Sequence, residues 1–229
     1  MKAIIGKLPL VAMLIPCVTL AGIDKVYDPY VEQGETEIEL RGIHQFDNID
    51  EHQVKFGVGY GINAVWAVEG YVIADEAPDR DTRIREAELE NRFQLTGKGE
   101  YWLDLGILTE LEKKLDDDLW ELKAGPVAQK QFGSWVTTVN LLLEKQFGSD
   151  RTDDDVQSIG RAQLKYRLSP ALEPGMEYYG DENTSAIGPV LLGKARWGVT
   201  PVKWSVGVFA GLNDTTADTS ARWELEWEF

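Results

Sequence analysis

The strongest constraint on the fold is a two-residue alternation of apolar and polar side chains from about residue 35 to the end of the chain. The final segment shows this pattern without a break. There the apolar set Ala221, Trp223, Leu225, Trp227 and Phe229 alternates with the charged set Arg222, Glu224, Glu226 and Glu228. Successive side chains of a β-strand point to opposite faces, so this period indicates strands with one apolar and one polar face. The chain is therefore predicted to be all-β.

Turn-forming residues divide the pattern into twelve runs, because glycine, proline, asparagine and aspartate gather between the alternating segments. The predicted strands cover residues 35–47, 52–61, 64–74, 83–95, 100–111, 119–128, 134–147, 156–168, 172–180, 186–197, 201–212 and 220–229. Sequential short strands with short connections favour one antiparallel up-and-down sheet. Residues 35–229 are therefore predicted to form a single domain.

The first 21 residues have the layout of a cleaved secretory signal peptide. A basic start with Lys2 and Lys7 precedes an apolar run over residues 8–20, and Ala21 provides a small residue at a cleavage position. The apolar run is too short for a transmembrane helix. Residues 22–34 are then predicted to be a periplasmic lead-in to the barrel.

Cys17 permits a second interpretation, in which it is the modified cysteine of a lipoprotein. The preceding Pro16 suits that interpretation poorly. Cleavage after Ala21 would remove the only cysteine of the chain, so the mature protein would contain no disulfide. We therefore expect the fold to be stabilised without covalent crosslinks, although the chain enters an oxidising compartment.

The overall charge excludes several classes of protein. The chain carries 39 acidic and 23 basic residues, a formal net charge of −16, which becomes −18 when Lys2 and Lys7 leave with the signal peptide. Such a polyanion repels nucleic acid. No apolar stretch after residue 21 approaches the length of a spanning helix, which excludes a helical membrane protein.

Connection chemistry favours a membrane barrel over a soluble sheet. Connections that follow even-numbered strands are predicted to be short, whereas those that follow odd-numbered strands are longer and acidic. The acidic connections are Asp47–Glu51, Asp75–Asp81, Glu112–Asp118, Asp150–Asp155, Asp181–Glu182 and Asp214–Asp218. Short periplasmic turns and longer external loops are typical of bacterial outer-membrane barrels.

Aromatic residues on the apolar parity gather at the strand ends. One predicted group, at the periplasmic end, contains Tyr60, Trp66, Phe93, Tyr101, Trp135, Tyr166, Trp197 and Phe229. The other contains Phe46, Trp120, Phe147 and Tyr178. Two aromatic belts that flank an aliphatic band are typical of a barrel whose apolar face contacts lipid.

The final strand, with Trp223, Leu225, Trp227 and a terminal Phe229, resembles the last strand of Gram-negative outer-membrane β-barrel proteins. The resemblance implies a transmembrane barrel in the bacterial outer membrane, in contact with its lipids and lipopolysaccharide. It also implies that these four residues form the signal read by the barrel-assembly machinery. A subfamily does not follow from it.

The polar parity is expected to line the lumen. A predicted acidic wall comprises Glu35, Glu37, Glu39, Glu86, Glu88, Glu90, Asp104 and Glu110. A predicted basic wall comprises Arg161, Lys165, Arg167, Lys194, Arg196 and Lys203. Facing walls of opposite charge would give a narrow porin-like channel for passive diffusion of small polar solutes. The same charges could instead pair and hold the barrel shut, leaving a structural or receptor barrel that acts through its external loops.

An outer-membrane lipid hydrolase is the least favoured alternative. Such an enzyme needs a serine and a histidine close together on the lipid-facing wall. The chain has only His44 and His52, and the candidate Ser158 lies on a distant predicted strand. The histidines also lack metal-ligand spacing to another histidine or cysteine, so no metal site and no cofactor are predicted.

Overall fold

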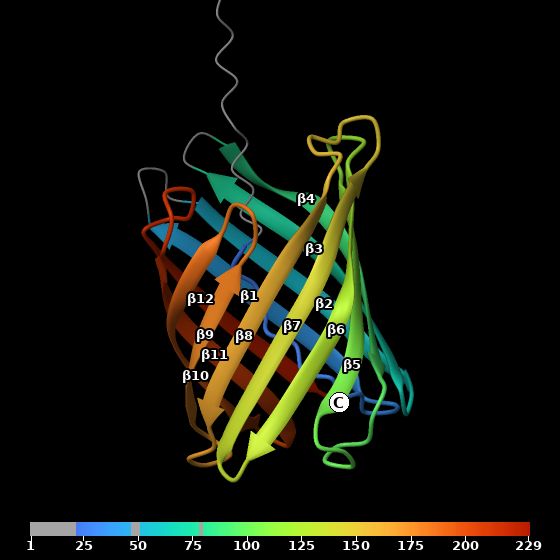
Figure 1. The fold of residues 1–229 in the computed structure, drawn as a ribbon, viewed down its shortest axis with the longest axis vertical. Helices are drawn as coiled ribbons and strands as arrows, with labels where there is room; N and C mark the ends of the chain where they lie inside the picture. Colours follow the sequence, from blue (N-terminus) through green and yellow to red (C-terminus); the bar gives the residue numbers. More distant parts are fainter. Residues whose placement is uncertain (1–21, 47–50, 78–79) are drawn as a thin grey trace, which may run out of the picture.

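The structure is a computed structural model that describes residues 22–46, 51–77 and 80–229. Its strands close into one barrel in which each strand pairs antiparallel with its sequence neighbours and β1 pairs with β12 (Figure 1). The predicted all-β, twelve-stranded up-and-down barrel is therefore confirmed. The predicted signal peptide and Cys17 lie outside the described residues. No helix of the described part of the chain has the length and apolar character of a membrane span.

The strands follow the chain in order around the barrel. Their bounds are β1 Thr36–Phe46, β2 Glu51–Asn63, β3 Trp66–Ala77, β4 Arg80–Gln94, β5 Asp104–Lys114, β6 Trp120–Phe132, β7 Trp135–Phe147, β8 Val156–Tyr166, β9 Glu173–Gly180, β10 Ser185–Trp197, β11 Thr200–Gly211 and β12 Thr219–Glu228. We call the end with the β2–β3 connection the turn end, and the end with the β1–β2 connection the loop end.

The connection between β4 and β5 is longer than predicted. Strand β5 was predicted from residue 100 but begins at Asp104, so residues 95–103 form a connection at the turn end. Gly99 has a left-handed φ of +70° and donates its N–H to Asp104 Oδ1 at 2.8 Å, which folds this stretch back on itself. Tyr101 therefore lies in a connection rather than on the strand to which it was assigned. Not every connection at the turn end is therefore short, although the sequence predicted that all of them would be.

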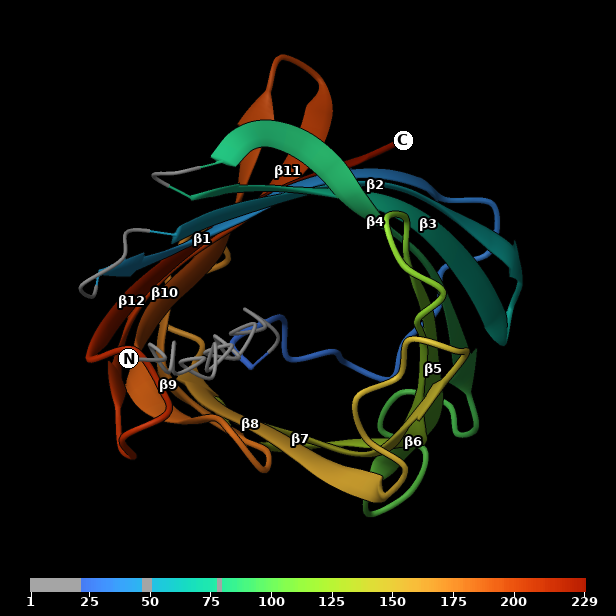
Figure 2. The ribbon, with the colours of Figure 1, turned by 90° about the horizontal axis from the view of Figure 1, so that it is seen from above.

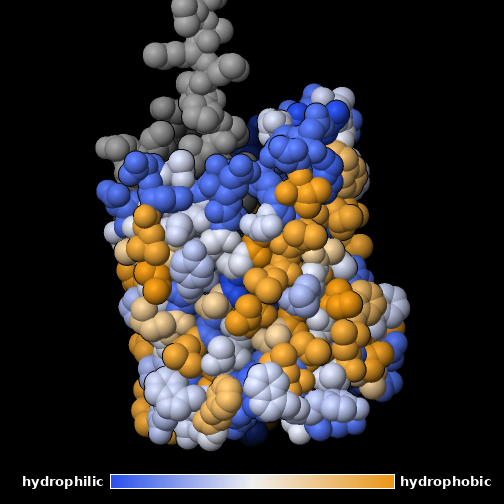
Figure 3. All heavy atoms as spheres, in the orientation of Figure 1, coloured by the Kyte–Doolittle hydropathy of each residue, from blue (hydrophilic) through white to orange (hydrophobic). Residues whose placement is uncertain are grey.

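The two faces of the wall have the chemistry that the alternation predicted. On β7, Leu141 and Leu143 face outward and are each 58% exposed, whereas Thr138 and Asn140 face inward and are buried. The space-filling view shows apolar side chains across the middle of the outer wall and polar ones above them (Figure 3). Cross-strand aromatic pairs lie near the strand ends: Trp66 with Phe93, Trp135 with Tyr166, and Trp120 with Phe147.

The barrel closes between the first and last strands. Thr36 and Phe229 exchange backbone hydrogen bonds of 3.0 and 2.9 Å, and the register continues to Phe46 opposite Thr219. Phe229 lies at the turn end and is 62% exposed. The terminal aromatic residue is thus part of the seam that closes the sheet.

Residues 22–34 run through the interior of the barrel, where Figure 2 shows them inside the ring of strands. We call them the lumen segment. Gly22 lies against Thr184 in the β9–β10 connection at the loop end, and the Gly34 N–H donates to the Gly61 carbonyl near the turn end at 2.8 Å. The segment thus traverses the lumen, whereas the sequence suggested only a periplasmic lead-in to the barrel.

Candidate functional site

The first anchor of the lumen segment is Asp24, which meets three cations of the barrel wall. Its carboxylate lies 2.6 Å from Arg41 on β1, 3.6 Å from Arg161 on β8 and 3.8 Å from Lys55 on β2. All three wall side chains are buried. We call these three residues the cationic socket, because together they surround one carboxylate at the middle of the lumen.

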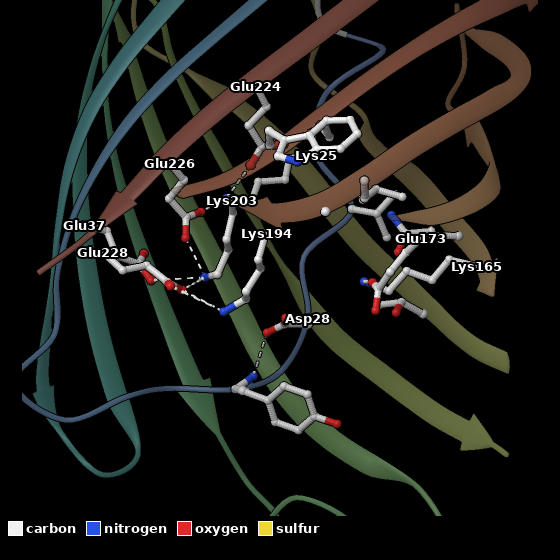
Figure 4. Close-up of a pocket in the computed structure, with 18 of the residues that line it drawn as sticks. Lys25, Asp28, Glu37, Lys165, Glu173, Lys194, Lys203, Glu224, Glu226 and Glu228 are labelled. Carbon is white, nitrogen blue, oxygen red and sulfur yellow. Dashed lines mark hydrogen bonds and ion pairs between the residues drawn. The ribbon is translucent and has the colours of Figure 1, made fainter. Parts of the chain in front are cut away.

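The second anchor is the next residue, Lys25, which meets three carboxylates. Its Nζ lies 2.6 Å from Glu39 on β1, and 3.0 and 2.9 Å from Glu224 and Glu226 on β12. We call Glu39, Glu224 and Glu226 the anionic socket. Figure 4 shows the Lys25 side chain directed at Glu224 and Glu226. Within the described residues, the three carboxylates of the anionic socket are also the group that lies close enough together to hold a metal ion. Here the ammonium of Lys25 lies among them.

The third anchor is Tyr27, which is 1% exposed. Its ring packs in an apolar cluster inside the lumen, formed with Leu108, Val127, Leu142 and Ile159. Its hydroxyl donates to Glu90 at 2.5 Å. The Asn140 side chain accepts from the Tyr27 N–H at 2.9 Å and donates to the Tyr27 carbonyl at 2.8 Å, so one amide satisfies both backbone groups.

Contacts continue toward both ends of the lumen segment. Ile23 packs in a second interior cluster, formed with Ile43, Tyr179, Ala186, Val190 and Phe209. The Asp24 carbonyl accepts from Tyr179 at 2.7 Å and also from Arg222. Toward the turn end, the Tyr30 hydroxyl donates to Asp104 at 2.7 Å and the Val31 N–H donates to Gln94 at 2.8 Å. The segment is therefore held along its length by the barrel wall.

A cavity of about 680 Å³ runs beside the lumen segment, from Lys25 at mid-lumen to the turn end. We call it the vestibule; its charged lining includes Glu35, Glu37, Arg92, Lys165, Lys194 and Lys203. Figure 4 shows Lys194 and Lys203 directed at Glu228 and Glu37. Toward the loop end, by contrast, a second cavity beside Asp24 measures only about 40 Å³. The lumen segment thus lines both a wide cavity and a small one.

The predicted acidic residues lie on the lumen parity, but their partners are mostly on nearby strands. Glu88 on β4 pairs with Lys55 at 2.7 Å, and Glu86 pairs with Lys114 on β5. Glu39, Glu90, Asp104 and Glu110 are buried around the lumen segment. Glu35 and Glu37 line the vestibule. The acids therefore form an interleaved network with local cations rather than a continuous acidic wall.

Five of the six predicted basic residues form three paired groups, and Arg196 lies apart from them. Arg161 is buried at mid-lumen and reaches Glu110 at 3.2 Å, the kind of pairing across several strands that the sequence suggested. Lys165 and Arg167 pair with Glu173, at 2.8 and 3.3 Å. Lys194 and Lys203 approach Glu228 at 3.2 and 2.7 Å, while Arg196 is exposed at the turn end of β10.

Several residues of the network were not among the site residues predicted from the sequence. They are Asp24, Lys25, Tyr27, Arg41, Lys55, Glu69, Arg92, Glu112, Lys123, Asn140, Glu177, Arg222, Glu224 and Glu226. Strand parity carries a usable signal for the wall residues, because Arg41 shares a face with Glu39, and Lys55 faces the lumen from β2. The three residues of the lumen segment carry no such signal.

The two histidines are neighbours across the sheet, which their spacing along the chain did not indicate. His44 on β1 pairs with His52 on β2, and their Nδ1 atoms lie 2.7 Å apart. Spacing along the chain does not reveal this proximity, because the sheet register places the two positions side by side. Ser158 pairs with Leu143 on β7, so the register does not bring it beside His44.

Hydrogen bonds join and order the acidic connections at the loop end. Asp118 after β5 accepts hydrogen bonds from the Ser149 backbone N–H at 3.0 Å and from the Ser149 hydroxyl at 3.1 Å. These bonds hold the pKa of the Asp118 carboxyl below its usual range. Asp153 in the β7–β8 connection accepts from the Asp155 N–H at 2.7 Å and from Gln157 at 2.6 Å. These carboxylates therefore act within the loops as hydrogen-bond acceptors.

Comparison with known proteins finds likeness in fold. An outer-membrane channel from Pseudomonas putida F1 aligns with a TM-score of 0.65 and 10% identity, over 90% of this chain and 100% of the channel. The KdgM porin in complex with disordered oligogalacturonate aligns with a TM-score of 0.59 and 10% identity, over 84% of this chain and 99% of the porin. No protein-family model and no curated protein sequence matches the chain. The fold is thus that of outer-membrane porins and channels, as predicted.

Proposed function

We propose that this protein is an outer-membrane channel for passive diffusion of small polar solutes, closed at rest by its own lumen segment. The observation that carries the proposal is the filling of the lumen by a segment held entirely by noncovalent contacts. A polar-lined vestibule of about 680 Å³ already leads from the turn end to this segment. Withdrawal of the segment would extend that compartment toward the loop end.

The wall network supports a releasable segment, because the socket cations keep carboxylate partners of their own. Arg41 Nε lies 3.1 Å from Glu39, and Arg161 lies 3.2 Å from Glu110. Lys55 likewise has Glu88 at 2.7 Å. A buried charge left without a partner is strongly destabilising. These wall pairs mean that departure of Asp24 would not leave the cations uncompensated.

The vestibule favours neutral or dipolar solutes over polyanions. The KdgM structure contains an oligogalacturonate, which is a chain of acidic sugars. In this protein the vestibule cations lie beside carboxylates, as Lys203 does with Glu226 at 2.5 Å and Glu228 at 2.7 Å. A polyanion would have to displace those acids, whereas a small polar or dipolar solute would not.

The proposal includes the cellular route. Residues 1–21 would direct export and be removed, and Trp223, Leu225, Trp227 and Phe229 would be read by the barrel-assembly machinery. Outer-membrane lipid and lipopolysaccharide would then contact the apolar outer wall. The loop end would face outside and the turn end would face the periplasm, in keeping with the hydrogen-bonded acidic connections at the loop end.

Single-channel recording in planar bilayers tests the proposal. We expect the wild type to open rarely, and Asp24→Ala to open more often because the cationic socket loses its ligand. Asp214→Ala provides the matched control, since it removes the same charge from an exposed position in the β11–β12 connection. If neither the wild type nor Asp24→Ala conducts above background, the protein is a non-conducting barrel that acts through its loops, and the channel proposal fails.

A further inference from the structure

We propose that the middle of the lumen is a peptide-binding site, that the lumen segment is its tethered ligand, and that short peptides enter the same site when the segment withdraws. This inference rests on the proposed channel function and names the class of solute. It follows from how the wall contacts the segment: it recognises backbone groups, a pair of adjacent opposite charges, and apolar side chains on either side of that pair.

The backbone is recognised by Asn140, which is completely buried. Its amide forms one hydrogen bond with the N–H of Tyr27 and one with the carbonyl of the same residue, at 2.9 and 2.8 Å. A side-chain amide has one acceptor and one donor group in a fixed arrangement, which matches the two polar groups of an extended residue. This contact is independent of side-chain identity, so it would accept other peptides.

The charged sockets add polarity and direction. The cationic socket of Arg41, Lys55 and Arg161 receives Asp24, and the anionic socket of Glu39, Glu224 and Glu226 receives the very next residue. The two sockets have opposite charges and receive adjacent residues, so they match a small group that carries one negative and one positive charge. A short peptide offers the same chemistry, since it carries an ammonium and a carboxylate at its termini besides any charged side chains. Ionised hydrogen-bond partners are roughly twice as strong as neutral ones.

Apolar pockets complete the site. Ile23 and Tyr27 each enter one of the two interior clusters, one on either side of the charged pair. Apolar clusters inside a lumen otherwise lined by charge have no role in passing ions or water. They are accounted for when the wall binds the side chains of a peptide. Small-molecule sites likewise combine apolar lining with a few placed polar groups.

Binding can be tested on the full mature chain. The triple variant Asp24→Ala, Lys25→Ala, Tyr27→Ala keeps every wall residue and weakens the tethered ligand. The probe is a fluorescently labelled peptide with the sequence of residues 22–31, titrated against detergent-solubilised protein and followed by anisotropy. We expect saturable binding to the variant, and binding roughly tenfold or more weaker to wild type, whose site is occupied.

Two matched controls examine specificity. A peptide with Asp24 and Lys25 exchanged has the same composition and net charge, and we expect it to bind roughly tenfold or more weakly, because each charge then meets a socket of its own sign. Adding Asn140→Leu to the triple variant should weaken both the native peptide and unrelated dipeptides. Equal binding of the native and exchanged peptides would overturn the inference. Absence of binding to the triple variant would also overturn it, provided that heat-modifiable migration shows that the barrel is folded.

The two proposals fail in different ways. Peptide binding without conductance in any variant would sink the channel proposal and leave the peptide site standing. Conductance of the triple variant that the native peptide does not block would leave the channel and sink the peptide site. A variant that lacks residues 22–31 gives a second measurement: if it folds, the added peptide should restore the closed state.

Discussion

At the scale of single residues, Tyr27 combines two kinds of contact that substitutions can separate. Tyr27→Phe removes the hydrogen bond to Glu90 and keeps the ring, a loss of about 1.5–3 kcal/mol for a bond to a charged group. Tyr27→Ala also empties the pocket formed by Leu108, Val127, Leu142 and Ile159, and large-to-small changes of aromatic residues cost about 3–5 kcal/mol. We therefore expect the open probability of single channels to rise in the order wild type, Phe, Ala.

Tyr101→Ala is the control for this series, because Tyr101 is 60% exposed in the β4–β5 connection. It should leave the open probability at the wild-type value. An open probability for Tyr27→Ala equal to that of the control would mean that the ring does not hold the lumen segment.

A second prediction at this scale concerns Gly57, which faces the lumen under the ring of Tyr71. A Cβ at Gly57 would lie 2.2 Å from the nearest Tyr71 ring atom, and the Tyr71 hydroxyl donates to Glu69 at 2.5 Å. Gly57→Val must therefore displace the ring, and overpacking of this kind costs about 1–3 kcal/mol. Gly70→Val is the matched control, since a Cβ at Gly70 meets no atom within 4 Å. Urea unfolding in detergent should show destabilisation at Gly57 only; equal midpoints would show that the ring shifts without cost.

At the scale of elements, the mobility of the lumen segment can be tested with a disulfide. An added Cβ at Gly106 on β5 would lie 2.9 Å from the Phe93 carbonyl oxygen and 3.0 Å from Cβ of Pro29. A shift of the strand and the segment apart would relieve both contacts and reach the ~3.5–4.5 Å between the Cβ atoms of a disulfide. The one cysteine of the sequence is Cys17, so a chain that begins at Gly22 has no other cysteine. In bilayers, oxidised Pro29→Cys, Gly106→Cys should not open, and reduction should restore openings. Pro29→Ala, Gly106→Ala controls for the loss of proline and glycine; openings that persist in the crosslinked protein would show conduction past a fixed segment.

The sequence predicted strands well and the lumen segment not at all, for a physical reason. Each strand has one face on the outside of the barrel and one on the lumen, so its alternation is a local signal, as in Trp223, Leu225 and Trp227. The lumen segment meets different strands of the wall along its length and borders the vestibule, so it has no such period. Its partners are distant in the chain; Lys25 and Glu226 are 201 positions apart. Such pairings follow from barrel closure, which spacing along the sequence does not encode.

The same reason explains the charged wall. Lumen-facing acids could be identified by parity, and Glu39, Glu88 and Glu90 are on the lumen side as expected. Which charge each acid meets depends on cross-strand register and on the side chains of the lumen segment. Lys55 on β2 approaches both Glu88 and Glu90 on β4. These residues are not register partners, because β3 lies between the two strands. Strand parity therefore predicts which residues line the lumen, but not which residues they pair with.

At the scale of the whole molecule, the barrel separates two environments, with lipid expected outside and the charged lumen inside. Leu141 lies at the middle of β7, faces outward and is 58% exposed. Arginine at the bilayer midplane of a barrel costs about 2–4 kcal/mol, falling to about 0–1 kcal/mol near the interfaces. Leu141→Arg should therefore make folding into lipid vesicles less favourable by about 2–4 kcal/mol.

Val156→Arg is the depth control for this prediction. Val156 begins β8 at the loop end, faces outward and is 60% exposed, nearly the same exposure as Leu141. The two substitutions thus differ in depth rather than in exposure or charge, and denaturant titration of folding into vesicles compares them directly. A larger cost at Leu141 follows if the apolar outer face contacts the hydrocarbon core. Equal costs would contradict the membrane orientation on which the channel, its closure and its peptide site all depend.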